Sequence, residues 1–243
     1  MTALLFRDDP YLREAPARVA GHTAEGGIVL EASLFYPTGG GQPGDAGHVE
    51  WSGGRIAIAT TVKGEGGAVV LVPAEPLPLP QPQPPVGAEL RQRIDWGRRY
   101  RHMRVHTGLH LLSVVIPLPV TGGQIGAGKG RLDFDMPHPP GDVTALEERV
   151  NELIARDLPV SEDWITDEEL AANPGLVKTM SVAPPVGQGR VRLIRIGEGA
   201  GQIDLQPCGG THVARTGEIG RVTIGNIEKK GRQNRRVSLI LSD

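Results

Sequence analysis

Short apolar runs separated by glycine fill residues 27–72, and they constrain the fold more than any other feature of the sequence. The runs are GIVLEASLFYP, AGHVEWS, RIAIATTV and AVVLV, with Gly53-Gly54 between the second and the third. Strands of this length joined by tight turns, without helical periodicity, are typical of a small antiparallel barrel. The alternating stretch GAELRQRIDW predicts one more strand of the same unit. We therefore expect a small glycine-rich antiparallel β-barrel over residues 1–96.

A proline-rich segment lies between the last two predicted strands of this barrel. The stretch PAEPLPLPQPQPP, residues 73–85, can form neither a helix nor a central strand. We expect an extended surface loop.

The hydrophobic period changes after Trp96. Helical spacing is found in RRYRHMRVHTGLHLLSVVI and again in TALEERVNELIARD, where Thr144 and Glu147 have capping-box spacing. Strand alternation follows the first helix in GRLDFDM and returns in VRLIRI, QIDLQ, GRVTIGNI and RVSLIL. The class is therefore α+β, with residues 97–243 forming a domain of two long helices packed on an antiparallel sheet.

Composition limits the class of protein further. The net charge of −2 gives no overall electrostatic case for a nucleic-acid partner, and the single cysteine excludes an intramolecular disulfide. The sequence contains no apolar run long enough to span a membrane and no signal-peptide pattern. We expect a cytoplasmic protein.

Two pairs of metal-binding residue types stand about a hundred positions apart. In HTGLH, His106 and His110 occupy positions i and i+4 of a predicted helix and share one face. In CGGTH, Cys208 and His212 offer a thiolate and an imidazole around two flexible glycines. Together the four side chains would complete a tetrahedral Zn²⁺ site. The alternative is that they are ordinary core and surface residues.

The residue after His106 narrows the chemistry of such a site. A zinc-protease helix carries glutamate there as the general base, whereas this sequence carries Thr107. A protease of that type is therefore disfavoured.

The segment FYPTGGGQPGDAG, residues 35–47, places three consecutive glycines after Thr38. Such a backbone can approach a ligand closely and offer N–H groups to it. It lacks the spacing of a phosphate-binding loop, and the alternative is an ordinary turn.

A basic cluster lies between the last two predicted strands. Five cations within eight residues could bind a phosphate backbone, or they could simply be solvated charges in a turn. The cluster consists of Lys229, Lys230, Arg232, Arg235 and Arg236.

Taken in order, four segments resemble the alanyl-tRNA editing proteins, the freestanding relatives of the editing domain in alanyl-tRNA synthetase. They are FYPTGGGQPGDAG, RRYRHMRVHTGLHLL, GAGKGRLDFD and DLQPCGGTHVARTGEIG…IEKKGRQNRR. A glycine-rich barrel before the editing domain is similar to the medium-length class of this family. One departure is Gly108, where many members have alanine.

The resemblance implies a trans-acting hydrolase that removes serine, and glycine, from tRNA(Ala) with the help of zinc. Thr38 is the candidate that reads the hydroxyl of serine. Asp204, on the strand that leads into Cys208, is the candidate catalytic-site residue beside the metal ligands, and the alternative is an ordinary strand residue. The basic cluster is the candidate tRNA contact. Substrate binding is expected from Gly39, Gly40, Gly41, Gln42 and Gln206.

Two alternatives remain beside this interpretation. The same zinc site could stabilise an RNA-binding module without hydrolase activity. The protein could also edit another aminoacyl-tRNA, because threonyl-tRNA synthetase has a related domain.

Overall fold

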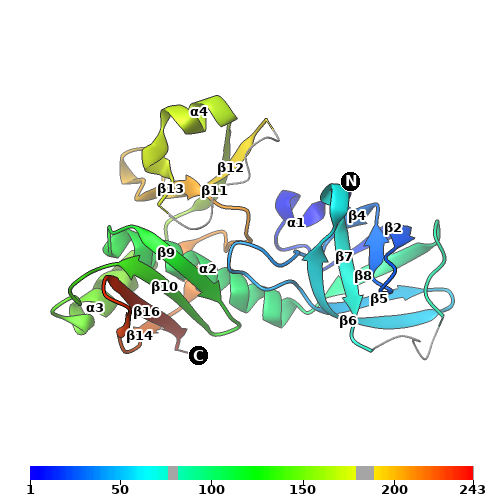
Figure 1. Cartoon of the computed structure of the whole chain (residues 1–243), viewed down its shortest axis with the longest axis horizontal. Coiled ribbons are helices and arrows are strands. Elements are labelled where there is room, and N and C mark those ends of the chain that lie inside the picture. The colour runs from blue at the N-terminus through cyan, green and yellow to red at the C-terminus, as the bar shows by residue number, and fades with distance from the viewer. Residues whose placement is uncertain (76–81, 179–188, 243) are drawn as a thin grey trace. The chain divides into compact units, whose positions relative to one another are not determined.

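The computed structural model describes residues 1–75, 82–178 and 189–242. It divides into two compact units, Met1–Tyr100 and Arg101–Asp243, and confirms the predicted α+β class (Figure 1). Residues 76–81 of the predicted proline-rich loop lie outside the described residues. Among the described helices, none has the length and apolar character needed to cross a membrane.

A closed barrel of six strands forms the first unit, in the order β2-β3-β7-β6-β5-β8. Its strands are β2 (Glu14–His22), β3 (Ile28–Leu30), β5 (Gly47–Trp51), β6 (Gly54–Lys63), β7 (Val69–Pro73) and β8 (Glu89–Ile94). Val19, Leu30 and Leu71 are buried in its core. The predicted hairpin at Gly53-Gly54 joins β5 to β6, and β8 closes the barrel by pairing with both β2 and β5.

Strand β2 was absent from the sequence-based prediction. Its residues include a proline and several small side chains, which weaken the strand signal. Ala15 and Val19 are its buried residues, and β2 pairs with β3 and β8. Short elements complete the unit, namely β1 (Ala3–Leu4), α1 (Leu5–Asp8), β4 (Ala32–Ser33) and the 3-10 turn η1 (Glu65–Gly67).

The second unit contains two sheets, whereas the sequence predicts one. The larger has the order β14-β16-β10-β9, with β15 also paired to β16. Its strands are β9 (Val120–Ile125), β10 (Lys129–Asp135), β14 (Val222–Ile224), β15 (Glu228–Lys230) and β16 (Asn234–Leu241). The smaller sheet has the order β11-β12-β13, from β11 (Val160–Ile165), β12 (Val191–Ile196) and β13 (Asp204–Pro207).

Helix α2 (Trp96–Val115) packs on the larger sheet at two glycines. A Cβ built at Gly130 of β10 would lie 2.5 Å from Val105 Cγ1 and 2.9 Å from Leu109 Cδ1. A Cβ at Gly108 would meet both methyl groups of Leu239 at 3.3 Å. Because these contacts use one side of α2, His106 and His110 are left on another.

Helix α3 (Val143–Ala155) begins two residues earlier than the predicted capping box requires. Its N-cap is Asp142, whose side chain accepts from the Ala145 N–H, so the predicted Thr144–Glu147 box is wrong. Glu147 instead accepts from the Ile224 N–H of β14 at 2.9 Å. The remaining helical elements are α4 (Asp167–Ala172), η2 (Pro174–Leu176), η3 (Gly199–Gly201) and η4 (Thr216–Ile219).

Candidate metal centre

Two segments of the second unit bring the four predicted metal ligands together. His106 and His110 lie one turn apart on α2, while Cys208 and His212 lie in the loop that follows β13. One ligand atom from each of the four lies within 4.8 Å of the others. This crowding is what a single metal ion with four protein ligands requires.

The sulfur atom lies close to two of the imidazoles. Cys208 Sγ is 3.4 Å from His106 Nε2 and 3.2 Å from His212 Nε2. The ring centroids of His106 and His212 are 4.2 Å apart, and those of His110 and His212 are 4.7 Å apart. The donor atoms therefore converge on one point.

Thr107 orients His212. Its hydroxyl lies 3.1 Å from His212 Nδ1 and donates to the Met103 carbonyl at 3.0 Å. The Val213 N–H reaches the same oxygen at 3.3 Å. Thr107 is completely buried. Thr107, the residue that disfavours a zinc protease, thus fixes the direction of the His212 imidazole. The spacing of the sequence does not indicate this role.

Asp204 orients His110. Its Oδ2 lies 3.0 Å from His110 Nδ1 and accepts from Gln206 Nε2 at 2.7 Å. Its Oδ1 accepts from Lys178 Nζ at 2.5 Å. A carboxylate behind a metal-binding histidine fixes its tautomer and raises its basicity. Lys178 was missed in the sequence because nothing in its local context points to residue 204.

The electrostatics at Cys208 and His212 favour the forms that bind a metal. Burial raises the pKa of the Cys208 thiol, but the neighbouring imidazoles, that of His106 first, outweigh this and hold it well below its usual range. Burial lowers the pKa of His212 well below its ordinary value. A thiolate and a neutral imidazole are the species that metals bind.

His110 and Asp204 form an ion pair in the same cluster. Burial lowers the pKa of His110, but Asp204 and Cys208 together raise it to about 9. Burial raises the pKa of Asp204, while His110 and Lys178 bring it down to about 2. His110 must therefore give up a proton when a metal binds.

The loop from Cys208 to His212 is held by an arginine. Arg192 Nη1 donates to the Cys208 carbonyl at 2.9 Å and to the Gly210 carbonyl at 2.8 Å. Neither Gly209 nor Gly210 is among the described glycines with positive φ. The tight turn thus depends on Arg192 rather than on the special backbone freedom of glycine that the sequence suggested.

The three-glycine segment of the first unit is a tight turn. Gly39 and Gln42 exchange both backbone hydrogen bonds, at 3.1 and 2.9 Å. Between them Gly40 and Gly41 have φ of 56° and 81°, values that favour glycine. Gln42 is fully buried, whereas Thr38, Gly40 and Gly41 are exposed.

The Thr38 hydroxyl already has two partners. Oγ1 donates to the Thr61 carbonyl at 3.2 Å and accepts from the Gly44 N–H at 2.9 Å. A hydroxyl oxygen has two lone pairs, so one acceptor position is left beyond these two bonds.

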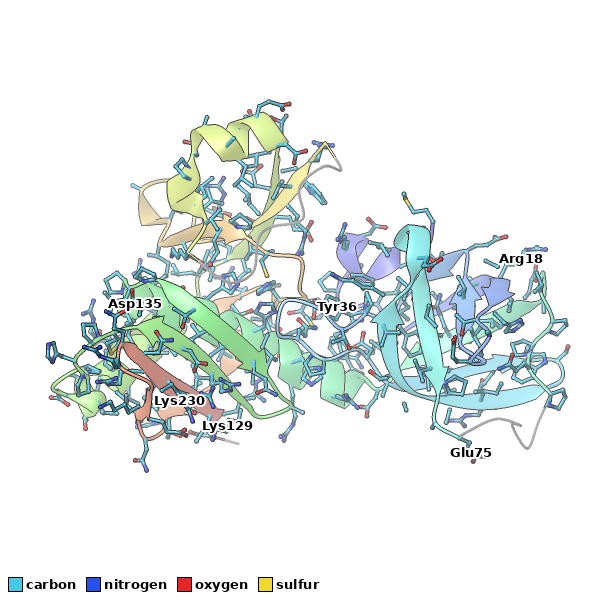
Figure 2. The ribbon with its side chains drawn as sticks, viewed as in Figure 1. Arg18, Tyr36, Glu75, Lys129, Asp135 and Lys230 are labelled. Carbon is cyan, nitrogen blue, oxygen red and sulfur yellow. The ribbon has the colours of Figure 1, made fainter. Side chains whose placement is uncertain are left out.

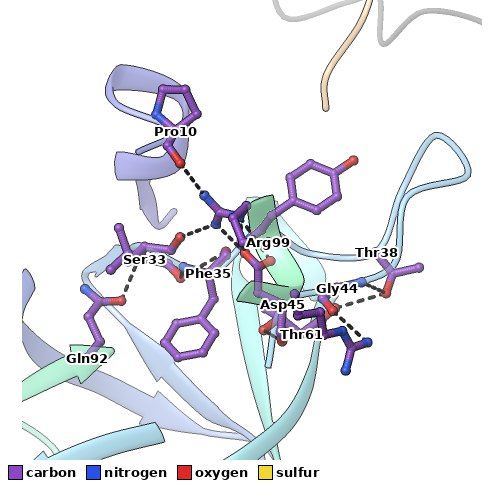
Figure 3. A network of polar contacts seen from close by, with 12 residues as sticks. Pro10, Ser33, Phe35, Thr38, Gly44, Asp45, Thr61, Gln92 and Arg99 are labelled. Carbon is purple, nitrogen blue, oxygen red and sulfur yellow. Dashed lines mark hydrogen bonds and ion pairs between the residues drawn. The ribbon is translucent and has the colours of Figure 1, made fainter. Parts of the chain in front are cut away.

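A buried ion pair stands behind this segment (Figure 3). Arg99 Nε donates to both carboxylate oxygens of Asp45 at 3.0 and 2.9 Å, and a second nitrogen also contacts Asp45. Arg99 further donates to the carbonyls of Pro10 and Leu34 at 3.0 and 2.8 Å. Asp45 accepts from the Tyr36 N–H at 2.7 Å. The pair ties the first turn of α2 to both ends of the glycine-rich segment.

The predicted basic cluster lies on the β15–β16 hairpin, where Lys230 can be seen in Figure 2. Lys229 and Lys230 are in β15, Arg232 is in the turn, and Arg235 and Arg236 are in β16.

Two arginines of this hairpin bind other segments of the protein, while Lys230 pairs with Glu228 of its own strand at 2.9 Å. Arg235 is 9% exposed and donates to the Pro137 carbonyl at 2.6 Å. Arg236 forms a two-pronged pair with Asp133, at 2.8 and 2.9 Å. The pKa of Asp133 is lowered mainly by this hydrogen bond. Counting the cations of this hairpin therefore does not separate these two arginines, which bind the protein, from the exposed cations.

Comparison with known proteins fits this geometry. Residues 191–238 match the family described as the threonyl and alanyl tRNA synthetase second additional domain. The chain is 34% identical to alanyl-tRNA editing protein AlaX-M of Methanosarcina acetivorans, and the match covers 100% of both chains. The corresponding protein of Methanosarcina barkeri is 33% identical, again over 100% of both. Alanine–tRNA ligase of Pyrobaculum arsenaticum is 34% identical over 94% of this chain and 25% of the ligase. The chain belongs to the family of alanyl-tRNA editing proteins.

Proposed function

We propose that this protein is a trans-editing hydrolase that cleaves the ester bond between tRNA(Ala) and wrongly attached serine or glycine. The observation that carries the proposal is the convergence of His106, His110, Cys208 and His212 in a chain of this family. Residues 97–243 would form the editing domain, and residues 1–96 would form a barrel that presents the glycine-rich segment.

Zn²⁺ is the metal that suits this donor set best. Three imidazoles and one thiolate match the ligand types and the number that zinc prefers. When bound, zinc can polarise an ester carbonyl or lower the pKa of a water molecule. Asp204 and Thr107 would hold two of the imidazoles in their binding orientation, and Gln206 would hold the Asp204 carboxylate in place.

Selection of serine over alanine would depend on the hydroxyl of serine. Serine differs from alanine by one hydroxyl, which an apolar pocket rejects by only roughly 1–3 kcal/mol, so a second site that binds this hydroxyl improves accuracy. Thr38 is exposed, and it has one acceptor position left after its bonds to Thr61 and Gly44. It would therefore accept a hydrogen bond from serine, which alanine cannot donate.

The backbone of the exposed glycines would approach the aminoacyl group on the same side as Thr38. Gln42 would support this turn from the interior, because its side chain is fully buried. Contacts with tRNA phosphates would come from Lys229, Lys230 and Arg232 rather than from the two arginines of β16.

A deacylation assay tests the proposal. Ser-tRNA(Ala), Gly-tRNA(Ala) and Ala-tRNA(Ala) are incubated with the protein as purified and after chelation. We expect hydrolysis of the first two, retention of the third, and loss of activity on chelation that zinc restores. Hydrolysis of none of the three by the zinc-loaded protein would overturn the proposal.

One observation favours a second candidate, a zinc-stabilised RNA-binding module. Four protein donors saturate tetrahedral coordination, as in structural zinc sites, whereas catalytic sites keep a position open. In that case tRNA would bind without being hydrolysed. Including Ser-tRNA(Thr) in the assay separates a third candidate, because the matching family model also covers a domain of threonyl-tRNA synthetase.

A further inference from the structure

The residues that hold His110 of the metal cluster lie on one face of the three-stranded sheet of the second unit. Directly paired residues of antiparallel strands point to the same side. Ile194 pairs with Gln206, and Ile196 pairs with Asp204, so these side chains share a face with one another. Asp204 and Gln206 contact His110 on this face.

The same face continues across the sheet to Trp164. Arg192 precedes Ile194 by two positions and therefore lies on the same side, and it pairs with Trp164 of β11. The Cys208 N–H donates to the Arg192 carbonyl at 3.1 Å, which extends the pairing to the metal-binding loop. Trp164, Arg192 and Cys208 thus form one row across three strands. Two strand spacings of about 4.8 Å put the Cα atoms at its ends roughly 10 Å apart.

The Arg192 side chain links the metal-binding loop to β11. It donates to the Cys208 and Gly210 carbonyls, and its other nitrogen binds Glu162 Oε1 at 2.6 Å. The arginine is 7% exposed. This contact neutralises Glu162, which stands two positions before Trp164 on the same face of β11, and links β11 to the metal-binding loop.

Trp164 offers an accessible aromatic surface. It is 37% exposed, and it is the only aromatic residue among the large apolar side chains exposed in the described parts of the chain. The guanidinium of Arg190 lies over its ring, 5.8 Å from the centroid. Aromatic rings and guanidinium planes are the groups on which proteins stack the bases of single-stranded RNA.

We propose that Trp164, together with Arg190, stacks the nucleobase of the 3′-terminal nucleoside of the RNA while the ester on that nucleoside lies at the metal cluster. The proposal rests on the proposed function, since it takes the substrate to be an aminoacylated RNA. A nucleoside is the part of such a substrate that immediately adjoins the ester, and the row spans a distance of that order. Arg190 adds the positive charge that a nucleotide favours.

The test measures binding of uncharged RNA, so it does not depend on hydrolysis. Two hairpins with the acceptor stem of tRNA(Ala) are compared, one complete and one lacking only the 3′-terminal nucleoside. The wild-type protein should bind the complete hairpin about tenfold more tightly, which is within the range for one stacked base. In Trp164→Ala the two affinities should become equal, while Trp164→Phe should retain most of the difference.

Leu118→Ala is the matched control, because Leu118 is 38% exposed in the same unit. It should leave both affinities unchanged, and Arg190→Ala should reduce the difference by a smaller factor than Trp164→Ala. Equal binding of the two hairpins by the wild-type protein would overturn the proposal that Trp164 stacks the terminal base. An unchanged difference between the two affinities in Trp164→Ala would overturn it as well. If the affinities follow the expected pattern but no charged tRNA is deacylated, the proposed function is overturned and base stacking on Trp164 is retained.

Discussion

Each unit contains a buried polar cluster, and the two clusters differ in how their polar groups are paired. In the first unit Arg99 and Asp45 neutralise each other, and their remaining hydrogen bonds go to the backbone. In the second unit His106, Cys208 and His212 turn their donor atoms toward one another. The first cluster is complete as it stands, whereas the second gathers electron-pair donors around one point.

The difference separates a structural cluster from a candidate metal site. Buried polar groups are stable when every donor meets an acceptor, as around Arg99. Lone pairs that converge repel one another unless a cation lies between them. The partners behind the rings, Thr107 and Asp204, hold two of the imidazoles by Nδ1, so that the opposite nitrogen is the one offered to the centre.

Removing a donor from the second cluster should have the largest effect. In Cys208→Ala and His106→Ala we expect loss of bound zinc and a decrease in Ser-tRNA(Ala) deacylation of at least about 100-fold, because three ligands hold the ion less well and the pocket loses its order. Metal content by atomic emission and initial rates of deacylation provide the measurement.

His138→Ala is the control, because His138 is an exposed histidine of the same unit outside the cluster. It should keep both the metal and the activity. Full activity of a metal-free sample would contradict the interpretation of the second cluster as a metal site. The second cluster would then be a structural one, like the Arg99–Asp45 pair.

Breaking the first cluster should affect stability instead of metal content. Arg99→Met leaves Asp45 buried without its counter-charge, and we expect the free energy of unfolding to fall by about 3–5 kcal/mol. Urea denaturation followed by tryptophan fluorescence measures this change, and bound zinc should stay at the wild-type level.

The double variant Arg99→Met/Asp45→Leu sharpens the same comparison. Removing both charges should recover much of the lost stability, because an apolar pair of similar size has no desolvation cost. If the double variant is as unstable as the single one, the bonds from Arg99 to the Pro10 and Leu34 carbonyls are the larger contribution.

Weakening the support of the second cluster should give an intermediate effect. Asp204→Asn keeps the shape of the side chain but removes the charge that holds His110. We expect zinc affinity to fall by about 10- to 100-fold, as is typical when a carboxylate behind a metal-binding histidine is lost. Competition with a chelator measures it. An unchanged affinity would mean that Gln206 alone is enough to orient the ring.

The sequence predicted the ligands of the second cluster because their residue types and spacings are specific. His106 and His110 follow helical spacing, and cysteine is a rare residue here. It also placed Asp204 and Gln206 next to the site, because both lie on the strand that leads to Cys208. The sequence indicates neither the contact of Thr107 with His212 nor that of Lys178 with Asp204, since both depend on contacts between distant segments.

The first cluster left no signal in the sequence. Arg99 and Asp45 are 54 positions apart, and neither lies in a motif that requires the other. The basic hairpin shows a different limit. Five cations in eight residues look alike when they are counted, but neighbouring residues of a strand point to opposite faces. Because side chains alternate between the two faces of β16, Arg235 is buried in the protein, and Arg236 forms an ion pair with Asp133.

Thr38→Val should have the smallest effect, and it tests whether the first unit is structural alone. Valine keeps the volume but cannot accept a hydrogen bond from serine, so we expect the ratio of Ser-tRNA(Ala) to Ala-tRNA(Ala) hydrolysis to fall by about fivefold. Thr38→Ser retains the hydroxyl and should keep the ratio. Both variants are compared by initial rates on the two charged tRNAs. A loss of stability without any change in this ratio would mean that the Thr38 hydroxyl serves only its bonds to Thr61 and Gly44, and the glycine-rich segment would then be as self-contained as the ion pair behind it.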